Sequence, residues 1–329
     1  MKKVLITGIG GQDGSYLAEL LLSKGYDVHG LVRKKAKNNI ENHHINLIPI
    51  INNLNIHTAA IEDNKSMLEI IRKIKPDECY HLASSSFVSY KFSDEAILLK
   101  NNFIATHSLL SAIKENSPSC RVYFAGSSEM FGDARISPQN EMTPFNPRSV
   151  YGISKLAAFH LARNYRERHN IYVAAGILYN HESVRRGAQF VTRKITQSVA
   201  KIYHGINNFV ELGDIDAKRD WGYAPDFVRA MYMMLQQDTP QDYVIATGQV
   251  RSVRDFLRTA FAVIGQDYKK YVKINKDYFR PSEVIDLRGD ASKAQKELGW
   301  MPTKSFDQFV AEMVQNDIDI IKNKNIDDI

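Results

Sequence analysis

A glycine-rich turn near the N-terminus constrains the fold more than any other feature of the chain. An apolar run at residues 3–7 enters the turn at residues 8–14, and leucines then recur at helical spacing until Gly25. Glycines at 8, 11 and 14 permit a tight turn, close approach of the backbone to a diphosphate, and close helix–strand packing. Tight turns also occur without a ligand, but this position favours a dinucleotide at the helix N-terminus. The residues expected to hold it are Gly8, Gly11, Gln12, Asp13 and Gly14.

Strand-like and helix-like segments alternate through the first half of the chain, which is typical of a parallel sheet with crossover helices. After about residue 180 the pattern loosens. We predict an α/β fold, a Rossmann-type doubly wound parallel sheet with a smaller mixed α/β substrate-binding lobe. Residues 1–180 would form the dinucleotide-binding domain, with residues from about 214–250 returning to it. Residues 181–329 would form most of the second lobe.

The charge distribution favours small phosphorylated ligands over a polynucleotide. The net charge is +6 and the pI is about 9, but the basic residues form short clusters near predicted strand ends. We see no continuous basic groove with stacking aromatic residues, so we expect no nucleic-acid partner. Solvated lysines that aid solubility would explain part of the same pattern.

Cysteine use and hydropathy indicate where in the cell the chain is expected. Cys79 and Cys120 lie in or beside predicted strands without metal-ligand spacing, so we expect reduced core residues and no metal. No apolar run approaches the roughly 20 residues of a membrane helix. The chain also runs from its first residues straight into a strand. The expected location is the cytoplasm, without membrane association.

A basic cluster ends the second predicted strand. Arg33, Lys34 and Lys35 stand where an NAD-specific fold offers an acid to the ribose hydroxyls. Cations at this place suit a 2′-phosphate, so the sequence predicts NADP as the cofactor, with Arg33 as a contact. A solvated basic loop is the alternative interpretation.

A tyrosine, a lysine and a glutamate supply the candidate acid–base chemistry. Of the 16 tyrosines, Tyr151 alone has a lysine four positions on, Lys155, which places both on one helix face. An ammonium beside a phenol would lower the pKa of Tyr151 and make it a base near neutral pH, although this spacing is also a common helical coincidence. Glu129 follows Ser127 and Ser128 at the end of an apolar strand. It is either a working acid or a loop residue bonded to amides.

Together these motifs resemble the extended short-chain dehydrogenases/reductases that act on nucleotide sugars. The turn at 8–14 and the segment Tyr151-Gly-Ile-Ser-Lys155 carry the resemblance. The segment GSSEMFG at 126–132 is similar to that of GDP-mannose 4,6-dehydratases, since dehydratases need an acid after the hydroxyl residue. Further matching segments lie at 11–30, 178–196, 212–237, 243–248, 280–290 and 292–300.

The resemblance implies a hydro-lyase that converts GDP-mannose, or a close manno-configured relative, to a GDP-4-keto-6-deoxy sugar. Tyr151 would take the 4-hydroxyl proton while hydride passes from C4 to NADP. Glu129 would take the C5 proton and assist loss of the 6-hydroxyl as water, with Ser127 bonded near O4, and hydride would return to C6. The implied catalytic residues are Ser127, Glu129, Tyr151 and Lys155.

The resemblance also implies which residues bind each ligand. In addition to the turn and Arg33, the cofactor contacts would be Leu82, Ala83, Ser84, Ser86, Tyr151, Lys155, His181 and Arg186. The GDP-sugar contacts would be Ser85, Ser128, Asn180, Glu182, Thr192, Lys194, Gly213, Arg219, Arg280 and Glu283. Arginines suit bidentate recognition of a diphosphate, although a surface arginine is often merely solvated.

Several positions depart from the family pattern beside the sugar and the adenine. Ser85 and Phe87 replace an amide and an imidazole, Ala60 replaces an acid, and Val184 replaces a proline. A GDP-manno-heptose is therefore an alternative substrate. A GDP-sugar 4-epimerase or reductase on the same scaffold, and a non-catalytic NADP-binding protein, are the alternative functions.

The expected partner, besides the GDP-sugar, is a second copy of the chain. By resemblance, the helices near 95–115 and 151–169 would form a homodimer. The loop after Arg33 lacks the segment that completes a tetramer in the family, so a homotetramer is left open.

Overall fold

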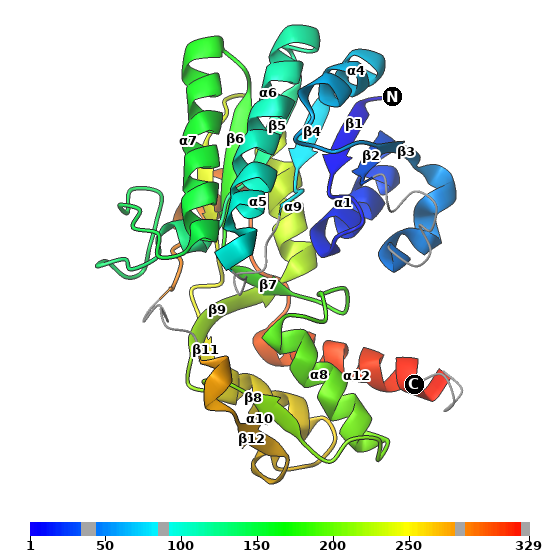
Figure 1. Cartoon of the computed structure of the whole chain (residues 1–329), viewed down its shortest axis with the longest axis vertical. Coiled ribbons are helices and arrows are strands. Elements are labelled where there is room, and N and C mark those ends of the chain that lie inside the picture. The colour runs from blue at the N-terminus through cyan, green and yellow to red at the C-terminus, as the bar shows by residue number, and fades with distance from the viewer. Residues whose placement is uncertain (34–43, 85–91, 280–286, 324–329) are drawn as a thin grey trace.

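A seven-stranded parallel sheet forms the centre of the larger lobe (Figure 1). The computed structural model describes residues 1–33, 44–84, 92–279 and 287–323. The strand order β10-β6-β5-β4-β1-β2-β3 reverses direction beside β1, so a crevice opens at the carboxyl ends of β1 and β4. The strands are β1 (Lys3–Thr7), β2 (Asp27–Val32), β3 (Asn55–Thr58), β4 (Glu78–His81), β5 (Arg121–Ala125), β6 (Val173–Leu178) and β10 (Asp242–Ile245).

Helices cover both faces of the sheet. One layer consists of α4, α6 and α7, which pack side by side, and α1 and α9 pack together on the opposite face. Because the strands are buried on both faces, Val4, Leu5 and Ile6 form a continuous apolar run with no exposed surface. The predicted α/β, doubly wound fold is confirmed. The helices are α1 (Gln12–Ser23), α4 (Asn64–Ile74), α6 (Ala105–Asn116), α7 (Val150–His169) and α9 (Ala224–Leu235), with α11 (Ser292–Leu298) packed on α9.

The helix predicted near 95–115 is interrupted by a wider turn. α5 (Glu95–Leu99) continues into a π-helical turn at Lys100–Ile104 and then into α6. The extra residue of a π turn shifts the register of the side chains that follow, and such turns frequently mark functional sites. Here the turn places the buried Asn102 against α7.

The smaller lobe has a hydrophobic core of its own. α8 (Val191–Tyr203), α10 (Val253–Ala262) and α12 (Phe306–Asn323) pack around Ile195 and Phe256. A three-stranded sheet, β11-β9-β7, lies between the two lobes in Figure 1. The short strands are β7 (Asn180–Glu182), β9 (Lys218–Tyr223) and β11 (Val250–Ser252), with β8 (Val210–Leu212) paired to β12 (Val272–Ile274).

Both cysteines lie in the core, as predicted. Cys79 in β4 and Cys120 beside β5 are free and fully buried, and burial raises the pKa of each thiol. Among the helices of the described ranges, none is long and apolar enough to cross a membrane.

A buried ion pair between Arg193 and Asp317 joins α8 to α12 in the smaller lobe. Removal of one partner leaves the other charge buried and uncompensated. We therefore expect Asp317→Leu to lower the free energy of unfolding by about 3–5 kcal/mol. Arg193→Met combined with Asp317→Leu should recover most of this loss. Urea unfolding measures both, and an equal or larger loss in the double variant would contradict the prediction.

Candidate active site

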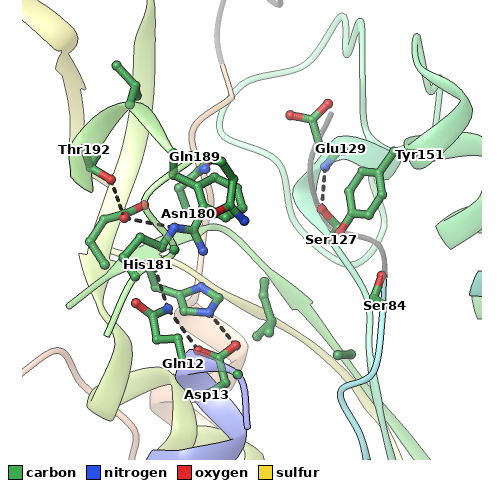
Figure 2. A pocket seen from close by; sticks show the side chains of 18 of the residues that line it. Gln12, Asp13, Ser84, Ser127, Glu129, Tyr151, Asn180, His181, Gln189 and Thr192 are labelled. Atoms are coloured by element: carbon green, nitrogen blue, oxygen red, sulfur yellow. Dashed lines mark hydrogen bonds and ion pairs between the residues drawn. The ribbon is translucent and has the colours of Figure 1, made fainter. Parts of the chain in front are cut away.

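A large cleft runs from the crevice at β1 and β4 into the space between the two lobes. Its volume is about 1480 Å³, and residues from Gly8 to Phe279 line it. Ligand pockets usually measure about 300–1,000 Å³, so this cleft has room for two ligands. Figure 2 shows that Ser127, Glu129 and Tyr151 lie across this space from Asn180, His181 and Thr192.

The glycine turn closes one end of the cleft. Gly8 has φ +74°, and a Cβ on it would lie 2.9 Å from the Ala83 nitrogen. A Cβ on Gly14 would lie 2.4 Å from the Gly8 carbonyl oxygen, so neither position accepts a side chain without a shift. Gly11 precedes α1 and has no side chain to cap its amides. These residues fit a diphosphate, whose oxygens would accept hydrogen bonds from those N–H groups.

The same end carries most of the other expected cofactor contacts. Arg33 follows β2, and Leu82, Ala83 and Ser84 follow β4, and all four line the cleft. Ser86 lies outside the described residues.

Ser127 and Glu129 sit where β5 ends. Ser127 caps a single 3-10 turn, Ser128–Met130, by accepting a hydrogen bond from the Glu129 N–H at 3.2 Å. This cap fixes the backbone from which the Glu129 side chain extends into the cleft (Figure 2). Ser128 is buried and also lines the cleft.

The first turn of α7 brings Tyr151 to this carboxylate. Ser149 caps the helix by accepting from the Gly152 N–H at 3.0 Å. Gly152 packs so closely that a Cβ would lie 2.5 Å from the Glu129 carbonyl oxygen. One turn later, Lys155 donates to the Ala125 carbonyl at 3.0 Å, which holds α7 against β5.

Burial dominates the protonation of this tyrosine and lysine. It raises the pKa of Tyr151 to about 12, against hydrogen bonds from Ser127 and Ser84 and the charge of Arg186, which favour the phenolate. Burial also lowers the pKa of Lys155 to about 8. The expectation that the pKa of Tyr151 lies below its usual value is therefore wrong for the chain by itself, because burial, together with the charge of Glu129, outweighs the groups that favour the phenolate.

Sequence reasoning missed Asn102, which links three parts of this wall. Its side chain accepts from the Ser84 hydroxyl at 3.0 Å and donates to the Ser154 hydroxyl at 2.9 Å. Ser154 in turn donates to the Tyr151 carbonyl at 2.7 Å. Asn102 thus supports Tyr151 through β4 and through α7. No local motif marks it, since only the π turn and the packing of α7 bring these groups together.

His81 is a second residue that the sequence did not single out. Its ring nitrogens lie 2.9 Å from the Thr7 hydroxyl and 3.0 Å from the Thr106 hydroxyl. Burial, with the nearby Lys155 charge, lowers the pKa of His81 to about 3, so the imidazole is neutral at pH 7. It ties the end of β4 to β1 and α6 and carries no charge toward the cleft.

On the opposite wall, Glu182 organises its neighbours. It is buried and accepts from the Thr192 hydroxyl at 2.6 Å, and its carboxylate lies 3.1 Å from Arg186. Burial raises the pKa of Glu182, and the charge of Arg186 opposes that rise. The Arg186 guanidinium also covers the Phe190 ring at 3.6 Å. These bonds hold Arg186 and Thr192 at the cleft surface.

The remaining expected substrate contacts line the same half of the cleft. They are Asn180, Lys194, Gly213 and Arg219. Lys194 lies 4.9 Å from the Tyr278 ring centre, and a Cβ on Gly213 would lie 2.7 Å from the Tyr278 carbonyl oxygen, so this segment closes the far end. Ser85, Arg280 and Glu283 lie outside the described residues.

His181 joins the two halves of the cleft. Its ring lies 2.9 Å from the Asp13 carboxylate and 2.7 Å from the Tyr179 carbonyl, and it stacks on Phe227. Burial disfavours the imidazolium, yet the charge and hydrogen bond of Asp13 raise the pKa of His181 overall. The pKa of Asp13 is lowered: burial would raise it, but the charge and hydrogen bond of His181, the hydrogen bond of Gln12 and the charge of Arg186 together outweigh that effect.

The doubly wound sheet, the glycine turn and the paired Tyr151 and Lys155 define an extended short-chain dehydrogenase/reductase. Solved structures show the same fold. A dTDP-glucose 4,6-dehydratase from Bacillus anthracis has a TM-score of 0.84 at 19% identity, covering 98% of each chain. A UDP-glucose 4-epimerase from Thermotoga maritima has a TM-score of 0.84 at 22% identity, covering 98% of this chain and all of that one.

Sequence comparison narrows this class to one family. The family model of GDP-mannose 4,6 dehydratase matches residues 5–313. A GDP-mannose 4,6 dehydratase of Cricetulus griseus is 45% identical over 98% of this chain and 92% of its own length. The Homo sapiens protein is 44% identical, covering 97% and 92%, and the Vibrio cholerae protein is 41% identical, covering 97% and 94%. The chain belongs to the GDP-mannose 4,6 dehydratase family, a family of hydro-lyases, as the sequence motifs predicted.

The depressed pKa of Lys155 predicts a specific pH dependence of stability. The unfolded chain keeps this proton up to about pH 10.5, whereas the folded chain releases it near pH 8. The buried charge therefore costs about 3 kcal/mol below pH 8, and this cost disappears as the pH rises toward 10.5. We expect Lys155→Met to gain stability relative to the parent chain below pH 8, and this gain to shrink between pH 8 and 10.5. Urea unfolding at a series of pH values measures the difference, and a difference independent of pH would refute the prediction.

Proposed function

We propose that the chain is an NADP-dependent GDP-sugar 4,6-dehydratase that converts GDP-mannose to the GDP-4-keto-6-deoxy sugar. The observation that carries this proposal is the convergence of Ser127, Glu129 and Tyr151 on one wall of a cleft that ends in a glycine cradle. The names of the relatives, each a GDP-mannose 4,6 dehydratase, support the substrate. Solved structures of the same fold contain NAD or NADPH, which supports a nicotinamide dinucleotide.

Tyr151 acts as the base at the 4-hydroxyl of the sugar. A nicotinamide dinucleotide held at the glycine turn would supply the hydride acceptor for C4 and the hydride donor for C6. The phenolate of Tyr151 receives the hydroxyl proton, and Ser127, Ser84 and Arg186 stabilise it against the cost of burial. Asn102 holds the start of α7 and the Ser84 hydroxyl in position for this step.

Glu129 acts at C5 and C6. A ketone at C4 acidifies the C5 hydrogen, and the Glu129 carboxylate accepts that proton. The C6–O bond then breaks, and the protonated Glu129 gives its proton to the departing hydroxyl, which leaves as water. Hydride addition at C6, with delivery to C5 of the proton that Tyr151 took from the 4-hydroxyl, would complete the product without net redox change and restore the phenolate.

Replacement of the acid should separate the two halves of the reaction. Glu129→Gln keeps the size and the capped turn but cannot accept the C5 proton, so we expect the rate of water loss to fall by about 10²–10⁴-fold. Mass spectrometry of the product after incubation with NADP and GDP-mannose measures the loss of one water. Glu167→Gln on the exposed face of α7 is the control. Equal dehydration by the Glu129 variant would remove Glu129 from this role.

The same assay distinguishes the alternative substrates and reactions. Faster water loss from GDP-manno-heptose than from GDP-mannose would assign the heptose as the substrate. An unchanged mass with both sugars, in a chain that binds NADP, would favour epimerisation or reduction.

Arg33 is the residue we propose to select NADP over NAD. It lines the cleft directly after β2, where a 2′-phosphate would meet its guanidinium. A charged hydrogen bond contributes about 1.5–3 kcal/mol, so Arg33→Met should raise the Kd for NADP by about 10- to 100-fold. The Kd for NAD should stay within about twofold. Calorimetric titration of both dinucleotides measures this, with Arg168→Met on α7 as the control; an equal loss for both would contradict the assignment.

A further inference from the structure

The segment at residues 181–185 is bonded to the first two turns of α1, although nearly 170 residues separate them in sequence. The Gln12 side chain donates to the His181 carbonyl at 3.1 Å and accepts from the Ser183 hydroxyl at 2.8 Å. Arg185 donates to the Ser15 hydroxyl at 3.1 Å. A continuous set of bonds therefore fastens the dinucleotide turn to the wall that carries the expected sugar-nucleotide contacts.

Arg185 strengthens this attachment on the outer side of α1. Its guanidinium lies 4.0 Å from the Tyr16 ring centre and 2.5 Å from the Glu19 carboxylate. Its side chain is largely buried by these contacts. The second turn of α1 is thus fastened to the segment after β7.

His181 at the centre of the attachment has the contacts of an imidazolium. Both ring nitrogens face oxygen acceptors, the Tyr179 carbonyl at 2.7 Å and the Asp13 carboxylate at 2.9 Å. A neutral imidazole has a single N–H and satisfies one acceptor, so a doubly protonated ring beside an ionised Asp13 satisfies both contacts. The other charged groups that act on His181 and Asp13 are Arg186 and Glu182, which pair with each other.

This charge state matters because Asp13 lies in the first turn of the helix whose N-terminus faces the cleft. An unpaired carboxylate there would repel the diphosphate of a dinucleotide, whereas the Asp13–His181 pair presents no net charge. On the other side of His181, its chain neighbours Asn180 and Glu182 line the sugar-nucleotide half of the cleft.

We propose that Asp13 and His181 are a positioning pair that couples dinucleotide binding to GDP-sugar binding. Contacts from a GDP-sugar to Asn180 and Glu182 stabilise the backbone on both sides of His181, and His181 holds Asp13 and the helix N-terminus in the form that accepts the diphosphate. This inference rests on the proposed function, since it assigns the two ligands to the two halves of the cleft.

Calorimetric titration of NADP in the presence and absence of saturating GDP tests the coupling in the full-length chain. In the parent chain we expect GDP to tighten NADP binding by about fivefold or more. His181→Asn should weaken NADP binding at least tenfold, because it exposes the phosphates to an unpaired Asp13. Asp13→Asn combined with His181→Asn should recover most of the NADP affinity but should keep no more than a twofold effect of GDP.

A matched control separates positioning from general stability. Arg166 and Asp242 form a largely buried ion pair, at 2.8 Å, that does not belong to the cleft lining, so Arg166→Gln removes a similar pair elsewhere. It should lower the melting temperature and leave the GDP effect intact. Failure of the double variant to recover NADP affinity, or an unchanged GDP effect in it, would overturn the pair's role. Failure of the parent chain to bind NADP or GDP at all would instead overturn the proposed function.

Discussion

The close contact between the start of α7 and the Glu129 carbonyl is the constraint on which the active site depends. Gly152 lets the helix approach to a distance at which a Cβ would lie only 2.5 Å from that oxygen. Because Tyr151 directly precedes this glycine, the contact sets the phenol beside Ser127 and near the carboxylate of Glu129 (Figure 2). The serine caps before each turn, Ser127 and Ser149, fix the two backbones in that arrangement.

The removal of charged side chains from water is the second constraint on the cleft. Two pairs of charged groups along its walls are Asp13 with His181, and Glu182 with Arg186. Burial of a charge costs free energy unless the charge is paired. These pairs therefore let charged side chains remain in a cleft with little water, in fixed orientations. Such orientation in advance of the reaction lets a site stabilise charge without reorganising at the transition state. At Tyr151 and Lys155 burial prevails, so the pKa of the tyrosine is raised and that of the lysine is lowered.

Periodicity predicted the parallel sheet and its helices well, because buried strands and amphipathic helices leave regular apolar patterns. It did not predict β7 and β9, since these short strands are polar in sequence and pair only with each other and β11. Nor did it predict the role of Asn102, whose partners lie on two other elements. The predicted direction of the Tyr151 pKa shift was wrong, because the spacing of residues in the sequence indicates which charges lie near the phenol but not how far the fold excludes water from it.

The sequence by itself determined the chemical groups of this protein: a glycine turn, a Tyr–Lys pair at helical spacing and an acid at a strand end. These are local patterns, and they were enough to identify the fold class and the family. Tertiary structure alone decided which groups meet, as in the bond between Asp13 and His181, and which carry charge. The physical reason is that both contact and desolvation depend on distances between segments remote in the chain, and no local pattern encodes those distances.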